Sequence, residues 1–321
     1  MEFALSEEQQ ELASMVRSLV DKRGDARIAT YDESLWSTMV EQIGLPALGI
    51  PEEHGGAGFT LFESLIALEE VGRSLAPSPL LSSLVTSEAL LAGADEEAKE
   101  RLLPRLAAGE VAAFADGAEA SHVLDGDLAS VLVVATDEGL FEVTDAERTW
   151  TPSMDQTIRL ATVRADLASA TRIGDGAAAR ERAHLVGAAG SAALAVGCAS
   201  RALDMTVSYS KERVQFGRAI GSFQALKHRM ADMLVLLEMA RSASWAASYA
   251  VSARTDDAEQ LVHVAKSYCG DALAHIAGET VQLHGGIAIT WEHDAHLVFK
   301  RAHALGQLFG ASRQHRAALA L

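Results

Sequence analysis

The stretch RVQFGRAIGSFQ, residues 213–224, interrupts a chain whose composition is otherwise that of alanine-rich helices. Its glycines predict a turn, and the helical periodicity on both sides predicts that this turn joins two long helices. A turn that leads into a helix leaves backbone N–H groups without helical partners, which suits an anionic ligand. Two explanations stay open at this point: a ligand site, or an ordinary helical corner with solvated arginines.

Three side chains of this stretch have the chemistry that a nucleotide ligand needs. Arg213 can meet a phosphate through its fork of donors. Phe216 offers a flat apolar face to an adenine, and Gln224 can donate and accept beside a pyrophosphate or a ribose. These three residues are therefore candidate ligand-binding residues.

Composition and charge limit the class of protein. The 321 residues are 49% hydrophobic, so the chain can bury a sizeable core in about two or three sub-domains. Lys and Arg total 27 against 44 for Asp and Glu, and the resulting charge of −17 argues against a nucleic-acid binder, which needs a basic face. Local arginines or helix N-termini must therefore meet any anionic ligand.

The same sequence gives expectations about location and thiols. MEFALSEEQQ, residues 1–10, is too acidic and polar for a signal peptide, and no uncharged apolar run reaches the roughly 18 residues of a membrane span. We therefore expect a cytoplasmic protein. Cys198 and Cys269 lie in apolar helical contexts without a CxxC partner, so we expect buried free thiols.

The periodicity predicts a mainly α fold that begins with a helical domain over residues 1–112. Ser6 and Gln9 have the spacing of a capping box, which predicts a helix over residues 6–22. The residues that this helix is expected to bury are Leu12, Met15, Val16, Leu19 and Val20. Further helices are predicted over residues 35–43, 61–74 and, capped by Asp95, to about residue 106.

A small β domain is predicted over residues 113–175, followed by a four-helix bundle over residues 176–321. In the β region, two β-branched runs flank Asp137–Gly139 as in a hairpin, and TIRLATVRA, residues 157–165, alternates like a strand. The bundle helices are expected over residues 178–210, 222–253, 258–283 and 294–308. Gly187, Gly190 and Gly197 follow no strand, so they indicate close helix packing rather than a dinucleotide-binding turn.

A second stretch, VQLHGGIAITWEHDAH at residues 281–296, also has a pattern with more than one explanation. Gly285 and Gly286 can stop a helix, or they can let a ligand approach the backbone while Gln282 hydrogen-bonds beside it. His293 and His296 flank Asp294, but we expect Asp294 to cap the last helix, and we expect no metal site.

Both stretches resemble signatures of the acyl-CoA dehydrogenase family. SKERVQFGRAIGSFQALKHRMADM and QLHGGIAITWEHDAHLVFKRA are similar to its two C-terminal signatures, the second usually written QxxGGxG. FALSEEQQEL and GLPALGIPEEHGGAGFTLFESLIALEEVGRSLAP resemble its N-terminal helical domain. The resemblance covers nearly the whole chain and implies the domain order given above. It also implies that Arg213 and Gln224 bind the pyrophosphate region of FAD and that Phe216 lies by the adenine. Gln282, Gly285 and Gly286 would lie along the same FAD, which the neighbouring subunit holds across a dimer interface.

The resemblance also shows what this chain lacks. Members of the family remove the α proton of an acyl-CoA with a glutamate while hydride passes to the flavin. The two positions of that glutamate correspond here to Phe309 and Gly187, and neither side chain accepts a proton. The family segments that hold the flavin ring and substrate, one of them Trp-Ile-Thr, have no clear match in the short β region.

These absences resemble the short partner chains of heteromeric actinobacterial acyl-CoA dehydrogenases. The resemblance implies a heterotetramer in which a longer homologous chain supplies the base and the acyl-CoA site, with no catalytic residue here, and electron-transfer flavoprotein as the acceptor. One alternative is a self-sufficient homo-oligomer with a displaced base at Glu181 or Glu238. The other is a non-enzymatic protein that kept the fold.

Overall fold

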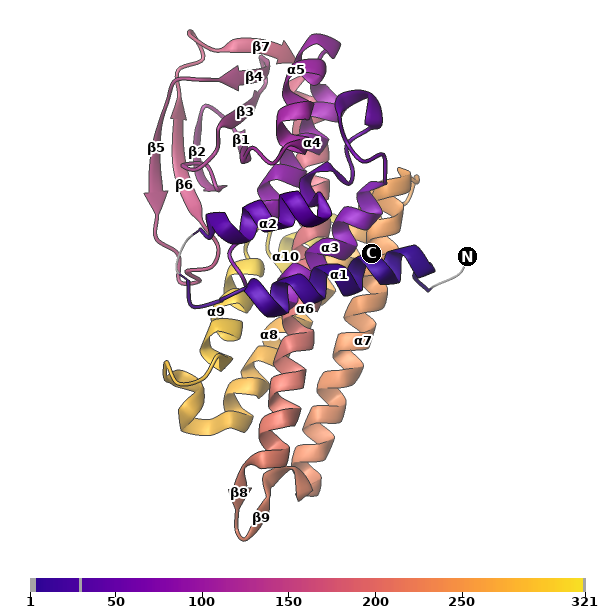
Figure 1. Ribbon diagram of the computed structural model, residues 1–321, viewed down its shortest axis with the longest axis vertical. Helices are drawn as coiled ribbons and strands as arrows, with labels where there is room; N and C mark the ends of the chain where they lie inside the picture. Colours follow the sequence, from indigo (N-terminus) through magenta and orange to yellow (C-terminus); the bar gives the residue numbers. More distant parts are fainter. Residues whose placement is uncertain (1–3, 29–30, 320–321) are drawn as a thin grey trace.

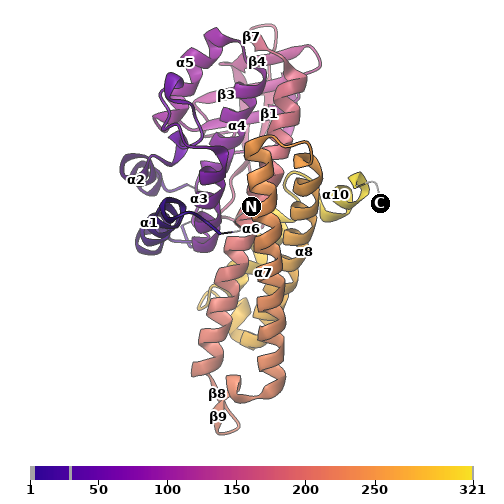
Figure 2. The ribbon, with the colours of Figure 1, turned by 90° about the vertical axis from the view of Figure 1, so that its right-hand side faces the viewer.

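The computed structural model describes residues 4–28 and 31–319 and has an elongated shape (Figure 1). Two small β-sheets lie at one end of the long axis, and a short hairpin lies at the other, as Figure 2 shows from a second side. The long helix α6 (Gly176–Glu212) runs from the sheets to the hairpin. Residues 1–3, 29–30 and 320–321 lie outside the described ranges, and so do the extreme ends of the predicted first and last domains.

The N-terminal part is helical, as predicted. Its helices are α1 (Glu7–Arg23), α2 (Glu33–Ile43), α3 (Leu61–Ser74), α4 (Leu80–Gly93) and α5 (Glu96–Ala107), with short turns η1 (Leu45–Ala47) and η2 (Glu52–His54) between α2 and α3. The capping box of Ser6 and Gln9 is confirmed, and Asp95 caps α5. Met15 was wrongly assigned to the buried face, because 47% of it is exposed and α1 buries only a narrower stripe.

The β region contains more strands than the sequence predicted. One sheet has the order β1 (Ala112–Asp116), β3 (Val131–Thr136), β4 (Gly139–Val143), β7 (Thr171–Gly174), and the other has the order β2 (Glu119–Leu124), β6 (Leu160–Ala165), β5 (Ala146–Thr151). The predicted hairpin is β3–β4, and the strand predicted in TIRLATVRA is β6. β1 and β3 are parallel, whereas the other pairs are antiparallel. Buried apolar side chains, among them Leu132, Val134 and Val163, form a separate small core for the sheets.

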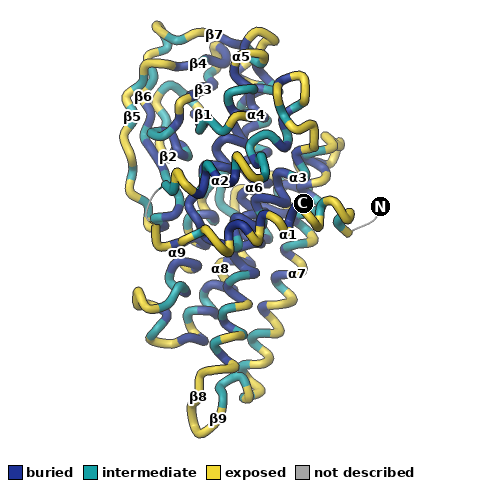
Figure 3. The backbone as a smooth tube through the Cα atoms, viewed as in Figure 1, coloured by how far each residue is buried: buried dark blue, intermediate teal, exposed yellow. Residues whose placement is uncertain are grey.

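The C-terminal part is a helical bundle of α6 (Gly176–Glu212), α7 (Gln224–Ala253), α8 (Ala258–His284) and α9 (Ala295–Leu305). The fourth helix is shorter than predicted, and a further short helix, α10 (Ser312–Ala318), follows it. The described part of α6 is long and apolar enough to cross a membrane by length and composition, but 89% of its apolar window is buried inside the fold. Figure 3 shows α6 as a mostly buried element between the N-terminal helices and the rest of the bundle.

One continuous hydrophobic core joins the N-terminal helices to the bundle. The glycines of α6 make this contact close, as predicted: a Cβ at Gly197 would overlap the carbonyl oxygen of Glu69 on α3. In the reverse direction, a Cβ at Gly72 of α3 would lie 2.8 Å from Cα of Leu194 on α6. The two helices therefore pack backbone to backbone. The boundaries at residues 112 and 175 remain predictions.

Candidate functional site

The stretch at residues 213–224 forms the hairpin at the far end of the bundle. Its strands are β8 (Val214–Gln215) and β9 (Arg218–Ala219), and a short 3₁₀ turn, η3 (Ile220–Ser222), leads from it into α7. Phe216 lies at the tip in a left-handed conformation (φ 54°), and 91% of it is exposed. A phenyl ring held so far into solvent is unusual for a core-forming residue, so this tip has the character of a contact surface.

The polar candidates of this stretch are also open to solvent. The Arg213 N–H donates to Tyr209 O at 2.8 Å, and Arg213 O accepts from the Ile220 N–H at 2.8 Å, so the backbone is held. Within the described residues, the Arg213 guanidinium makes no ion pair. Gln224 is the first residue of α7, and no side chain caps that helix start. Arg213 and the start of α7 therefore keep donors free for an anion.

The second stretch ends α8 on the same end of the molecule. Gln282 is exposed, and Gly285 turns the chain with a positive φ of 66°. A Cβ added at Gly285 or Gly286 would meet nothing within 4 Å. Nothing within the described chain therefore crowds Gly286, and its surface is open to the close approach of another molecule.

A stack of rings brings the two stretches together. Tyr209, one turn before Arg213, stacks on His284 with ring centroids 4.4 Å apart and an interplanar angle of 28°. His284 directly precedes Gly285, and its Nδ1 lies 2.7 Å from Thr280 O. Tyr209 and His284 were not among the candidate residues predicted from the sequence. The only signal for them was their position beside the two signatures.

Asp294 occupies the N-cap position of α9, as predicted, but its side chain makes no capping hydrogen bond among the described residues. Its carboxylate instead accepts from Arg27 at 2.8 Å and from Arg201 at 3.0 Å. Burial by itself would raise the pKa of Asp294, but the hydrogen bonds from the two arginines outweigh it and hold the pKa below its usual value. Among the described residues no group of His, Cys, Asp or Glu has the arrangement of a metal site.

A cavity of about 910 Å³ lies far from the hairpin, between the start of α4, the strands β1, β2 and β6, and the end of α9. Most of its wall is apolar. Its polar residues include His184, whose Nε2 lies 3.0 Å from Asp116 Oδ2, and Arg180 binds the other oxygen of Asp116 at 2.6 Å. The residues that line the apolar part are Val85, Phe114, Val123, Leu124, Met154, Ile158, Leu160, Leu308 and Phe309.

The two residues at the expected base positions, Phe309 and Gly187, contact each other at this cavity. A Cβ at Gly187 would lie 2.5 Å from Cζ of Phe309 and closer still to two other ring atoms, so the ring occupies the space of a side chain at 187. Phe309 has a φ of 52°, and its carbonyl oxygen lies 2.9 Å from His315 Nε2. The buried Lys266 donates to Gly310 O at 3.0 Å. Neither position therefore presents a carboxylate to the cavity.

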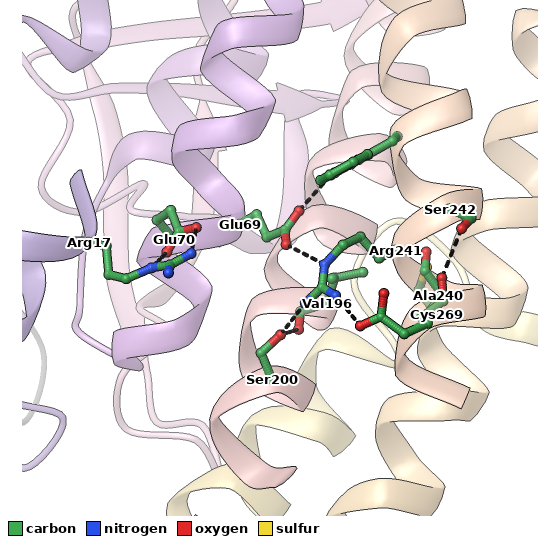
Figure 4. Close-up of polar contacts among 11 residues, drawn as sticks. Arg17, Glu69, Glu70, Val196, Ser200, Ala240, Arg241, Ser242 and Cys269 are labelled. Atoms are coloured by element: carbon green, nitrogen blue, oxygen red, sulfur yellow. Dashed lines mark hydrogen bonds and ion pairs between the residues drawn. The ribbon is translucent and has the colours of Figure 1, made fainter. Parts of the chain in front are cut away.

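The two glutamates considered as displaced bases do not line this cavity. Glu181 is exposed on α6. Glu238 pairs with Arg241 beside a different surface hollow of about 470 Å³. Figure 4 shows this network, in which Arg241 reaches Glu69 at 3.2 Å and Ser200 at 2.9 Å. Glu238 is thus held by an arginine on the surface of the bundle.

Comparisons with known proteins agree on one family. Residues 6–110 match the family model "Acyl-CoA dehydrogenase, N-terminal domain", and residues 174–320 match "Acyl-CoA dehydrogenase, C-terminal domain". The chain is 41% identical over 318 residues to acyl-CoA dehydrogenase IpdE2 of Mycolicibacterium smegmatis, and the aligned residues cover 97% of each chain.

Solved structures show the same fold. The ChsE4–ChsE5 complex from Mycobacterium tuberculosis is similar with a TM-score of 0.88 and 22% identity, over 99% of this chain and 98% of that chain. A structure described as a Tcur3481–Tcur3483 steroid ACAD G363A variant is similar with a TM-score of 0.83 and 28% identity, over 98% of this chain and 96% of that chain.

Proposed function

The chain belongs to the acyl-CoA dehydrogenase family, whose members use FAD, and we propose that it is the subunit of a heteromeric enzyme that lends FAD contacts to a homologous catalytic partner. The enzyme would introduce an α,β double bond into an acyl-CoA thioester. FAD accepts the hydride in this family, and the partner chain would supply the proton acceptor and the acyl-CoA site.

The observation that carries this proposal is the chemistry of the hairpin end. Arg213 has a free guanidinium among the described residues, Phe216 is 91% exposed, and Gly285 and Gly286 leave an open backbone. This donor set fits a phosphate-bearing ligand with an aromatic base. In a chain of charge −17, a local arginine is needed to attract such an anion.

Each candidate residue then has a role that its position allows. Arg213 and Gln224 would bind the pyrophosphate region, and Phe216 would lie by the adenine. Gln282, Gly285 and Gly286 would lie along the same cofactor, where the glycines permit a close backbone approach. These residues would hold and orient the nucleotide end of FAD without taking part in bond breaking.

The residues at the two expected base positions support a partner chain that supplies the proton acceptor. Phe309 packs on Gly187, so neither expected base position carries a carboxylate. Two of the similar structures are named as pairs of proteins. We therefore propose a heterotetramer with one FAD per pair of chains, working in the cytoplasm with electron-transfer flavoprotein as the acceptor. The name of one similar structure refers to steroids, so the substrate class we propose is the acyl-CoA derivative of a sterol side chain or a fatty acid.

The test is co-expression of this chain with a longer homologue from the same source. Flavin absorbance per mole of each chain and acyl-CoA oxidation are measured for the complex and for each chain alone. We expect FAD and turnover only in the complex, and we expect Arg213→Ala to weaken FAD retention. Arg313→Ala, an exposed arginine of α10, is the matched control and is expected to retain FAD.

One observation favours the self-sufficient alternative, namely the cavity of about 910 Å³ that this chain keeps. Under that alternative the lone chain binds one FAD per polypeptide and oxidises acyl-CoA. Glu181→Gln or Glu238→Gln would then abolish its turnover. A lone chain that binds one FAD per polypeptide and oxidises acyl-CoA would overturn the heteromeric proposal.

A further inference from the structure

We propose that Tyr209, His284 and His293 form a positioning unit, called here the ring stack, that sets Arg213 and the Gly285–Gly286 turn at the spacing one cofactor requires. This inference rests on the proposed function. It assigns a role to residues that contact or adjoin the candidate FAD-binding residues and that do not contact the cofactor themselves.

The geometry links three separate segments. Tyr209 lies on the last turn of α6, and its carbonyl oxygen accepts the Arg213 N–H at 2.8 Å. Its ring stacks on His284 at 4.4 Å and meets His293 edge-on at 6.0 Å. The rings of His284 and His293 are 4.3 Å apart. The end of α6, the end of α8 and the loop before α9 are therefore fixed to one another through these rings.

The surroundings of the two imidazoles favour their neutral forms. Thr280 O can only accept, so the His284 Nδ1 at 2.7 Å carries the proton. Its Nε2 is then a bare acceptor, and this atom is buried without a hydrogen-bond partner among the described residues. The Ala295 N–H donates to His293 Nδ1 at 3.2 Å, so that nitrogen has no proton. A proton on His293 Nδ1 would break this bond, and a second proton on His284 would place a charge on a buried ring.

The charges around the stack also oppose protonation. Burial lowers the pKa of His284 and His293 adds to the effect, while backbone hydrogen bonds with Thr280 and Met205 act in the opposite direction without outweighing burial. Burial lowers the pKa of His293 as well, where Asp294 acts in the opposite direction and Arg27 and Arg201 add to the lowering. His296, on α9 beside these residues, also has a lowered pKa, mainly because it is buried.

The sign of the pH dependence follows from linkage. In the closed form the three rings are in contact, and in an opened form the histidines are exposed to solvent. Because the pKa of each histidine is lower in the closed form, the opened form binds more protons. Acidification below the ordinary histidine value of about 6.5 therefore favours the opened stack. We expect the complex to lose FAD more readily at about pH 5.5 than at about pH 7.5.

The experiment uses the complex with the longer homologue and measures FAD retained after gel filtration at these two pH values. His284→Ala removes two ring contacts, and we expect FAD to dissociate about fivefold more readily than from the wild type at pH 7.5, the factor that corresponds to about 1 kcal/mol. The difference should be smaller at about pH 5.5, where the wild-type stack already opens. His284→Phe keeps a flat ring that cannot titrate, so it should retain FAD at pH 7.5 and lose less of it on acidification than the wild type. Tyr249→Ala, which removes a ring stacked edge-on to Phe62 elsewhere, is the control.

The outcomes separate this inference from the proposed function. If Arg213→Ala weakens FAD retention while His284→Ala does not, the ring stack has no positioning role and only this inference falls. If His284→Ala fails to fold, His284→Phe decides, because an acid-release profile identical to that of the wild type would overturn the inference. If Arg213→Ala also leaves FAD retention unchanged, the proposed function falls with it.

Discussion

Replacement of Gly187 by alanine tests the contact that separates this chain's cavity from a catalytic one. The new Cβ would lie 2.5 Å or less from ring atoms of Phe309, far inside the optimum carbon–carbon separation of about 3.5–4.0 Å. The ring cannot withdraw easily, because His315 and Lys266 hold the carbonyl groups of residues 309 and 310. Overpacking of this kind costs about 1–3 kcal/mol, and alanine in place of glycine in a helix returns about 0.5–1 kcal/mol. We therefore expect a net loss of about 1–2 kcal/mol, which lowers Tm by about 2 °C in a chain of this length.

The assay is calorimetric unfolding of the purified chain, with two comparison variants. Gly278→Ala is the matched control, since a Cβ there meets nothing within 4 Å, and it should stabilise the protein slightly. Phe309→Ala removes the ring, so the added methyl group at 187 should cost less in the double variant than in the wild type. The reasoning is refuted if Gly187→Ala is as stable as Gly278→Ala, or if the effects of the two substitutions simply add.

Three further predictions concern buried groups. Burial raises the pKa of Asp125 from 3.8 to about 7. The contribution of its protonated carboxyl to the free energy of unfolding is therefore fully present below pH 3.8 and is lost as the pH rises toward 7, by on the order of 4 kcal/mol in all. Asp125→Asn should flatten this pH dependence in urea unfolding measured at several pH values. Burial lowers the pKa of Lys266 to about 8, so the free energy of unfolding should rise between pH 8 and 10.5. Lys266→Met should abolish this rise. It should also lower the free energy of unfolding by about 1–3 kcal/mol, because Leu305 O and Gly310 O lose their hydrogen-bond donor. Burial raises the pKa of Cys198 and of Cys269 to about 12, so neither thiol should react with an aromatic disulfide reagent until the protein is unfolded, and fast reaction of the native protein would contradict this.

The sequence predicted best those features that depend on neighbouring residues. The capping box of Ser6 and Gln9 and the cap at Asp95 are local, and both are present. The first three predicted bundle helices agree closely with α6, α7 and α8 because their apolar patterns are long, whereas the short fourth one ends earlier than predicted. β1, β2, β5 and β7 escaped prediction, since they are short and contain few of the alternating apolar residues that mark a strand.

Features set by distant partners could not be predicted in this way. Asp294 lies at the predicted N-cap position, but its side chain makes no capping bond among the described residues because Arg27 and Arg201, far away in the sequence, bind its carboxylate. The contact of Phe309 with Gly187 and the stack of Tyr209 on His284 likewise join residues of separate helices or of a helix and a loop. The candidate residues were chosen for their chemistry, which by itself left an ordinary helical corner open, and the resemblance to a family then implied their separate roles.

The backbone contact between α3 and α6 sets a rule for chimaeras. Gly72 and Gly197 let the two helices touch without side chains between them, and each position is fitted to a residue of the other helix. A transplanted N-terminal segment that carries alanine at position 72 would be pushed outward by the width of a methyl group. Chimaeras of family members should therefore take α3 and α6 from the same parent and join the two parental sequences at another position.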